Sequence, residues 1–241
     1  MRDWKMSSFC GRLGAVQYSK FSFSDLGFVW RESLRGKSLP RILLNLSLKK
    51  HPFDRLSGKV MDLGAKSDES SYYRFLEKDK SADLHFCDYF TEGPNLMKID
   101  LEEPFPTTLN DFDFVLCFNT IEHIFNTDNL ISESVRIMKK GGKFIGCVPF
   151  LYPFHADPDD YHRYTHSALE KIFEKHGLKM KKMTSVGVGP FVLGFQSTPA
   201  PRFLRAVFQS GLFLLDLIGN FYYKKYAGNF SLLYLFEAVK S

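Results

Sequence analysis

Acidic side chains follow four of the five apolar segments in the middle of the chain. Asp62 lies at the end of the first segment, Asp88 follows the second, Asp100 follows the third and Glu122 follows the fourth. An acid after the second segment, 24 residues beyond Gly64, occupies the position that holds ribose hydroxyls in nucleotide-binding βαβ units. Turn acids that only bond their own backbone are the structural alternative. The joint placement favours a nucleoside-containing ligand.

The segment after the fifth apolar run is richer in ionisable groups than a simple connection needs, and such loops commonly carry function. His155 is the first candidate for a base that removes a proton from an acceptor, because a neutral imidazole suits that task near pH 7. A hydrogen-bonded loop histidine is the alternative. Asp160 and Arg163 can contact substrate together with Tyr161, or pair with each other. No helical spacing of histidines supports a metal site, so none is expected.

From Gly58 onward, short apolar runs alternate with longer amphipathic segments, a pattern that predicts βαβ units and a parallel sheet. This sheet would position the residues named above. Strands are predicted at 59–63, 82–87, 95–99, 112–118, 143–150, 178–189 and 230–240. Helices are predicted at 67–78, 129–140, 168–176 and 203–223. The expected caps are Thr127 or Asp128 for the second helix and the Ser167 and Glu170 pair for the third, while Gly141 and Gly142 should stop the second.

Length and charge restrict the class of protein. The chain has 241 residues and a net charge of +5 from scattered lysines and arginines, which indicates one large domain with an extension and no nucleic-acid partner. Its four cysteines form no paired metal motif, and the first thirty residues contain no apolar signal core, so a cytoplasmic location is expected. Arg205 and Asp216 argue against a membrane span in 203–223. A membrane-surface or dimer contact through 203–223 is the second interpretation.

Five segments in order resemble the motifs of class I S-adenosylmethionine-dependent methyltransferases of the broad type 11 group. They are VMDLGAKSDESSYYRFL, MKIDLEEPFP, FDFVLCFNTIEHI, SESVRIMKKGGKFIGCVPF and HRYTHSALEKIFEKHGL, within residues 58 to about 190. The loop PFLYPFHADPDDYHRYT further resembles a subgroup whose members are mostly assigned by similarity, often near polysaccharide or secondary-metabolite pathways.

The resemblance implies a role for each motif residue. Cofactor contacts would come from Asp62, Gly64, Ala65, Lys66, Asp88, Asp100, Leu101 and Asn119. His155 and His123 would be catalytic, and Glu122, Asp160, Tyr161 and Arg163 would meet the acceptor. Glu122 and His123 could instead merely start a short helix. Lys66 departs from the family's glycine, and it either pairs with the methionine carboxylate of the cofactor, which we favour, or fills the pocket.

The expected fold is a Rossmann-like α/β methyltransferase domain at 58–241, with a seven-stranded, mostly parallel sheet whose last strand is antiparallel. A helical or irregular extension at 1–57 and an aromatic helical insertion at about 200–228 complete the chain. The expected function is methyl transfer from S-adenosylmethionine to oxygen or nitrogen of a small molecule or saccharide, which could be lipid-linked. The alternative is a non-catalytic scaffold that has lost the cofactor through Lys66. Much of the excess in the 16% aromatic content lies in the two flanks of 58–190 and in the loop from Phe150 to Tyr164, which suggests an acceptor lid or an interface.

Overall fold

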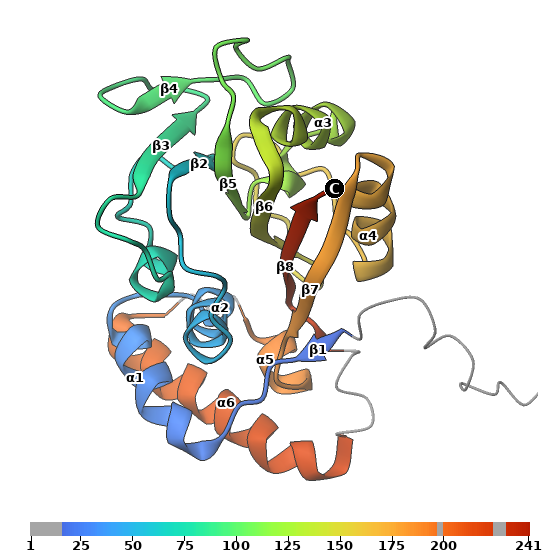
Figure 1. Cartoon of the computed structure of the whole chain (residues 1–241). Helices are drawn as coiled ribbons and strands as arrows, with labels where there is room; N and C mark the ends of the chain where they lie inside the picture. Colours follow the sequence, from blue (N-terminus) through green and yellow to red (C-terminus); the bar gives the residue numbers. More distant parts are fainter. Residues whose placement is uncertain (1–15, 197–199, 224–229) are drawn as a thin grey trace, which may run out of the picture.

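The computed structural model describes residues 16–196, 200–223 and 230–241. A large sheet forms the upper part of the molecule in Figure 1, and three helices from the two ends of the chain gather below it. The first fifteen residues of the expected extension, which include Cys10, lie outside the described residues, as do 224–228 of the expected insertion.

The sheet contains eight strands in the order β1-β7-β8-β6-β5-β2-β3-β4. It is mostly parallel, and β8 runs antiparallel to both β6 and β7. The predicted Rossmann-like fold with an antiparallel last strand is therefore confirmed. The extra strand is the two-residue β1, which pairs parallel with β7 at the edge. The strands are β1 (Gln17–Tyr18), β2 (Lys59–Leu63), β3 (Asp83–Asp88), β4 (Leu96–Lys98), β5 (Phe112–Phe118), β6 (Met138–Pro149), β7 (Leu178–Val186) and β8 (Leu233–Lys240).

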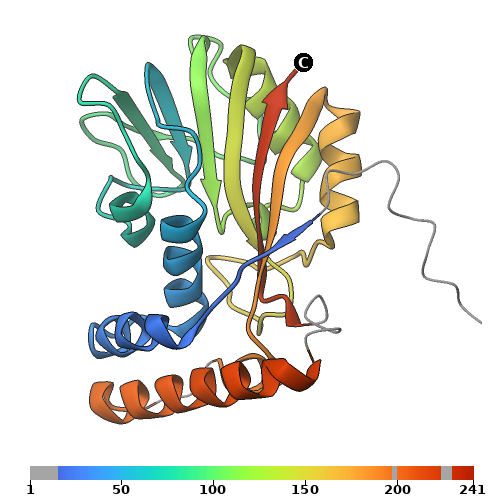
Figure 2. The ribbon, with the colours of Figure 1, turned by 60° about the horizontal axis from the view of Figure 1, so that its bottom comes forward.

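The sheet separates two hydrophobic cores because successive side chains of a strand point to opposite faces. In β5, Phe114 and Leu116 enter one core, while Val115 and Cys117 enter the other. The second core is covered by α3 (Thr127–Ile137) and α4 (His166–Lys175). The first is covered mainly by α2 (Leu39–Lys50), which lies against the sheet in Figure 2.

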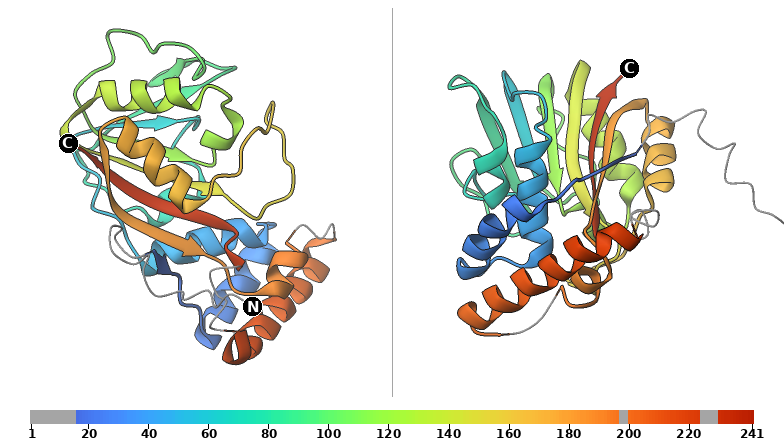
Figure 3. Two further views of the ribbon diagram at one scale, coloured as in Figure 1. Left: turned by 90° about the vertical axis from the view of Figure 1, so that its right-hand side faces the viewer. Right: turned by 90° about the horizontal axis from the view of Figure 1, so that it is seen from below.

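Helices from both ends of the chain pack together below the sheet. They are α1 (Leu26–Leu34), the short α5 (Pro190–Gly194) and the long α6 (Arg202–Tyr223), and Figures 2 and 3 show α1 and α6 side by side. Ser33 of α1 donates a 2.5 Å hydrogen bond to Gln209 of α6, and Trp30 packs edge-to-face on Phe203. Short 3₁₀ turns complete the structure: η1 (Phe23–Asp25), η2 (Ser71–Phe75) and η3 (Ile121–His123).

The predicted helix at 67–78 is wrong, since only the 3₁₀ turn η2 forms there. Its residues are committed to a tertiary contact: the hydroxyls of Tyr72 and Tyr73 donate to Asp62 Oδ2 at 2.8 and 2.6 Å. Both neighbouring tyrosines must then face the same carboxylate, and Leu76 follows in an extended conformation. This contact replaces the regular helix that the periodicity suggested.

The boundaries of two other helices also differ from expectation. Asn126, rather than Thr127 or Asp128, caps α3 by accepting from the backbone N–H of Asn129. The helix ends at Ile137, and Gly141 has its positive φ of 75° inside β6, so the two glycines do not stop the helix. Thr165 caps α4 by accepting from the N–H of Ala168, so the helix starts before the predicted Ser167 and Glu170 pair.

Within the described ranges, no helix is long and apolar enough to cross a membrane. Several apolar side chains of α6 are exposed, among them Phe203 and Phe208, at 62% and 54% exposure. Asp216 on the same helix is fully buried, and its two carboxylate oxygens accept the backbone N–H groups of Phe191 and Val192. The acid that interrupts the apolar pattern therefore fixes the N-terminus of α5.

Candidate cofactor and acceptor site

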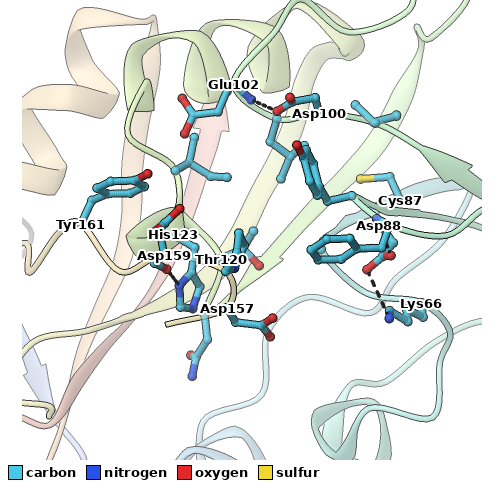
Figure 4. Close-up of a pocket in the computed structure, with 18 residues that line it drawn as sticks. Lys66, Cys87, Asp88, Asp100, Glu102, Thr120, His123, Asp157, Asp159 and Tyr161 are labelled. Carbon is cyan, nitrogen blue, oxygen red and sulfur yellow. Dashed lines mark hydrogen bonds and ion pairs between the residues drawn. The ribbon is translucent and has the colours of Figure 1, made fainter. Parts of the chain in front are cut away.

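A cavity of about 400 Å³ opens at the carboxyl ends of β2, β3 and β5, where ligands bind in open α/β sheets. Figure 4 shows the side chains that converge on it. Eight of the predicted site residues line this cavity: Gly64, Lys66, Asp88, Asp100, Leu101, Asn119, His123 and Tyr161. The sheet edge therefore brings together most of the residues that the motifs singled out.

Gly64 lets the backbone turn tightly at the entrance to this cavity. Its φ of +86° is a conformation that residues with a side chain rarely adopt, and a Cβ atom here would lie 2.6 Å from Thr120 Oγ1. Thr120 donates to the carbonyl oxygen of Leu63 at 3.1 Å, so it cannot readily move aside. The glycine thus keeps the tip of β2 close to the tip of β5.

Asp88 is held in position by its own loop. Its Oδ1 accepts the backbone N–H groups of Phe90 and Thr91, both at 2.9 Å, and the Thr91 hydroxyl at 2.7 Å. Although partial burial opposes it, this set of hydrogen bonds keeps the pKa of Asp88 below its usual value. The other oxygen, Oδ2, lies 3.8 Å from Lys66 Nζ. Asp88 therefore combines the turn role with an oxygen on the cavity side.

Lys66 does not block the cavity in this arrangement. Its side chain is 62% exposed and extends along the cavity wall toward Asp88. The Lys66 ammonium therefore places a positive charge beside the Asp88 carboxylate. The geometry leaves room for a ligand beside Lys66.

Asp100 and Leu101 line the opposite wall after β4. Asp100 Oδ1 accepts the backbone N–H of Glu102 at 2.9 Å, which is an Asx-type turn. The Glu102 carboxylate in turn accepts the backbone N–H groups of Phe125 and Asn126 at 2.6 and 2.7 Å. This wall is therefore tied to the segment that leads into α3.

Two predicted cofactor contacts do not line the cavity. Ala65 is buried beneath it, and Asp62 is 1% exposed and bonded to the two tyrosines of η2. Burial raises the pKa of Asp62 to about 6, although the two hydroxyl donors act in the opposite direction. Among the described residues its Oδ1 has no hydrogen-bond partner. Asp62 therefore holds η2 against β2.

A second cavity of about 320 Å³ adjoins the first. Asn119, His123 and Asp157 line both cavities. Asn119 has a φ of 53°, a left-handed conformation that is uncommon for a residue with a side chain and that often occurs at functional sites. The remaining wall comes from α2, the loop after β6 and the start of β8: Ser38, Pro40, Arg41, Leu44, Tyr152, His155, Ala156 and Leu233.

Glu122 lies beneath the junction of the two cavities with its side chain fully buried. Its Oε1 is 3.8 Å from His123 Nε2 and 3.7 Å from His155 Nε2, and the two imidazole rings meet edge-to-face with centroids 5.0 Å apart. Interaction with the Glu122 carboxylate raises the pKa of His155 above its usual value. Both predicted catalytic histidines are thus brought to one buried carboxylate.

The path of the loop after β6 is fixed by an ion pair between Arg163 and Asp160. The guanidinium donates to both carboxylate oxygens, at 2.5 and 2.6 Å, and to the carbonyl oxygen of Tyr152 at 3.2 Å. Asp160 also accepts the backbone N–H of His155 at 2.8 Å. The geometry gives Asp160 and Arg163 the structural role that the sequence left open, and this role places His155.

Several lining residues were not predicted from the sequence, including Arg41, Thr120 and Glu102. Arg41 lies in the extension, where no motif pointed to the site, and it reaches the acceptor-side cavity only because α2 packs against the sheet. Thr120 and Glu102 directly neighbour predicted residues, so their positions beside strand ends were the available signal. Their roles become visible only through bonds to distant backbone groups.

The model of the methyltransferase domain family matches residues 72–146, which include β3, β4, β5 and α3. The chain has the class I S-adenosylmethionine-dependent methyltransferase fold. No curated protein sequence matches the chain.

Solved structures of similar fold have low sequence identity to this methyltransferase-fold chain. A protein from Listeria monocytogenes, assigned as an S-adenosylmethionine-dependent methyltransferase, is 14% identical with a TM-score of 0.53, over 84% of this chain and 99% of that one. The [4+2]-cyclase SpnF is 13% identical with a TM-score of 0.53, over 90% and 93%. YcgJ from Bacillus subtilis is 15% identical with a TM-score of 0.50, over 82% and 97%. At such identities the likeness establishes the fold and leaves the reaction open.

Proposed function

We propose that this protein transfers a methyl group from S-adenosylmethionine to an oxygen or nitrogen of a small molecule or saccharide. The observation that carries the proposal is the pair of adjoining cavities, which meet at Asn119, His123 and Asp157. Methyl transfer needs a donor and an acceptor held in line, so that most of the catalysis comes from positioning. The cavity beside Asp88 would take the donor and the cavity beside Arg41 the acceptor.

The residues of the first cavity suit the proposed cofactor. Asp88 Oδ2 can accept hydrogen bonds from a ribose diol, since Oδ1 alone holds the turn. Gly64 permits close approach of a ligand to the backbone, and Leu101 provides an apolar contact for a base. When bound, S-adenosylmethionine supplies an already activated methyl group on its sulfonium. The protein then has to orient the acceptor and accept the proton that the acceptor loses.

The acceptor-side cavity has groups nearby that could take up the acceptor's proton. We place the acceptor's reacting atom near His123, which lines both cavities, and His155, which lines the second, with the Glu122 carboxylate behind both rings. A buried carboxylate flanked by two imidazoles can take up or displace a proton from a hydroxyl or amine. Arg41 on the far wall favours an acceptor with an anionic or strongly polar group.

The test is methyl transfer from radiolabelled S-adenosylmethionine to a panel of saccharides, sugar phosphates and small hydroxylated acids. We expect incorporation into at least one acceptor, and at least a tenfold loss of turnover in His155→Ala. The control His166→Ala changes a histidine that lines neither cavity and should keep wild-type turnover. Full turnover by His155→Ala would remove this residue from the acceptor site.

A non-catalytic scaffold is the second candidate, and the ion pair between Lys66 and Asp88 is the observation that favours it. If Lys66 holds the ribose-binding carboxylate for itself, the fold can persist without its cofactor. The cyclase among the structures of similar fold also illustrates that this architecture is not limited to one reaction. Titration of S-adenosylmethionine into wild type and Lys66→Gly separates the two: absence of binding in the wild type with rescue in the variant would establish the scaffold.

A further inference from the structure

The carboxylate of Glu122 is buried in an unusual electrostatic situation. Its side chain is 0% exposed, and neither Oε1 nor Oε2 has a hydrogen-bond partner among the residues that the structure describes. A buried carboxylate without hydrogen bonds is costly unless a cation neutralises it. The nearest candidates for that role are groups that approach Oε1 from two directions.

Those groups are the Nε2 atoms of His123 and His155, at 3.8 and 3.7 Å from Oε1. Both separations exceed the 2.7–3.2 Å range of N–H···O hydrogen bonds. One donor atom from each of the three residues lies within 4.8 Å of the others. Ligands of one tetrahedral or octahedral ion at about 2.1 Å lie roughly 3.0–3.4 Å apart, so the three side chains would have to move closer together on binding, the imidazoles toward each other as well as toward Glu122.

The opposite nitrogens of the two rings define which atoms have free lone pairs. His123 Nδ1 lies 2.5 Å from the carbonyl oxygen of Asp159, and His155 Nδ1 lies 3.2 Å from that of Pro153. A carbonyl oxygen can only accept, so His123 Nδ1 carries a proton. Around His155 Nδ1, the Pro153 carbonyl oxygen at 3.2 Å and the Asp160 carboxylate at 3.4 Å favour the same tautomer, against the Arg163 guanidinium, whose Nη2 lies 3.4 Å away. The neutral form of each ring then directs a lone pair from Nε2 toward Glu122. Backbone carbonyls hold metal-binding histidines in this same tautomer.

From this arrangement we propose that Glu122, His123 and His155 bind one divalent transition-metal ion at the junction of the two cavities. Two imidazoles and one carboxylate favour ions such as Zn²⁺, Mn²⁺, Fe²⁺ or Co²⁺ over Mg²⁺ and Ca²⁺, which prefer oxygen ligands alone. The sequence argued against a metal because the histidines have no helical spacing. The structure instead assembles the three ligands from η3 and the loop after β6.

Such an ion would have coordination positions open to the acceptor-side cavity, because three protein ligands leave room for others. An acceptor hydroxyl bound there would lose its proton more readily, since a bound cation stabilises the alkoxide. The histidines would then act as ligands in place of bases. This use of the ion rests on the proposed methyl transfer, whereas binding of the ion does not.

The test is titration of CoCl₂ into the full-length protein after removal of metals by EDTA, followed by visible absorption. We expect one equivalent to bind with a micromolar or lower Kd, and ZnCl₂ but not MgCl₂ to displace it. Glu122→Gln and His155→Ala should each weaken binding at least 30-fold. His162→Ala changes a histidine of the same loop that is outside the cluster, and it should bind like wild type.

Circular dichroism and thermal unfolding monitor the fold of each variant, and His155→Ala, which changes a partly exposed loop side chain, provides the measurement if Glu122→Gln does not fold. Absence of stoichiometric Co²⁺ binding, or binding unchanged in both variants, would overturn the metal site. Titration of S-adenosylhomocysteine in the absence of metal is independent of this result. Failure of the metal site and failure of the proposed methyl transfer are thus distinguishable.

Discussion

The cofactor cavity and the acceptor-side cavity share three lining residues, but their carboxylates are used in opposite ways. Asp88 and Asp100 each accept backbone N–H groups of their own loops, so they are stabilised before any ligand arrives. Glu122 is fully buried, and both of its oxygens lack hydrogen bonds within the described part of the chain. The first arrangement suits neutral hydroxyl groups, and the second calls for a cation.

The largest expected effect is on the free energy of unfolding and concerns Asp62, a buried carboxyl that does not line the cofactor cavity. Asp62 has a folded pKa of about 6, compared with an ordinary value of 3.8. The native state therefore binds the Asp62 proton more tightly than the unfolded state does. The resulting stabilisation of the native state is complete below about pH 4 and is lost as the pH rises through about 6. Relative to Asp62→Asn, we expect the wild-type free energy of unfolding to fall by about 3 kcal/mol across this window.

Urea unfolding at pH values from 4 to 7 measures this difference. Asn keeps an acceptor for the hydroxyls of Tyr72 and Tyr73, so the comparison isolates the charge. Asp111→Asn, at an exposed position just before β5, serves as a control and should have a curve parallel to wild type. Parallel curves for Asp62→Asn and wild type would show that burial does not perturb this carboxyl.

The next effect concerns Asp88, the carboxylate that we propose binds the cofactor. In Asp88→Asn the side-chain oxygen still accepts the N–H groups of Phe90 and Thr91, but the atom facing the cavity becomes a donor. Hydrogen bonds to charged groups contribute about 1.5–3 kcal/mol, so we expect S-adenosylhomocysteine to bind roughly 10- to 100-fold more weakly. Calorimetry measures the affinity, and unchanged affinity would place the ribose elsewhere.

A smaller effect should be confined to the acceptor side. Arg163→Ala removes the partner of Asp160, whose side chain is 1% exposed, and thereby loosens the loop that places His155. We expect kcat/KM for an identified acceptor to fall about tenfold, which corresponds to about 1.4 kcal/mol. The Kd of S-adenosylhomocysteine should stay within twofold of wild type. A parallel loss of cofactor affinity would mean that the two cavities do not act separately.

The smallest expected effect concerns Lys66. If its ammonium pairs with the carboxylate of the bound cofactor, Lys66→Gly should weaken S-adenosylmethionine binding by about two- to fivefold, since exposed ion pairs contribute roughly 0.2–1 kcal/mol. Titration calorimetry at low and moderate salt measures this difference, which should shrink as salt rises. Tighter binding by the variant would instead indicate that Lys66 obstructs the cavity.

Features that depend on one strand or turn could be predicted from the sequence. β5 was predicted with its observed bounds because its run is apolar on both faces, as buried parallel strands are. The acids at the tips of β3 and β4 were identified because parallel strands end at one edge of a sheet. Local pattern is sufficient where a residue's role depends on its own strand or turn.

The remaining features depend on contacts between distant segments. The tyrosines of η2 have helical spacing, but their bonds to Asp62 prevent the helix. The position of His155 beside Glu122 follows from the ion pair of Arg163 and the path of its loop. Arg41 reaches the acceptor-side cavity because α2 packs on the sheet. Periodicity and spacing contain no information about these tertiary contacts.

The central claim is that the cavity beside Asp88 binds the methyl donor, and calorimetry with S-adenosylhomocysteine tests it most directly. We expect one binding site per chain with a Kd in the micromolar range for the wild type. Asp88→Asn should bind more weakly, and Asp83→Asn should bind like wild type. No heat of binding at millimolar ligand in the wild type, for protein shown to be folded by circular dichroism, would contradict it.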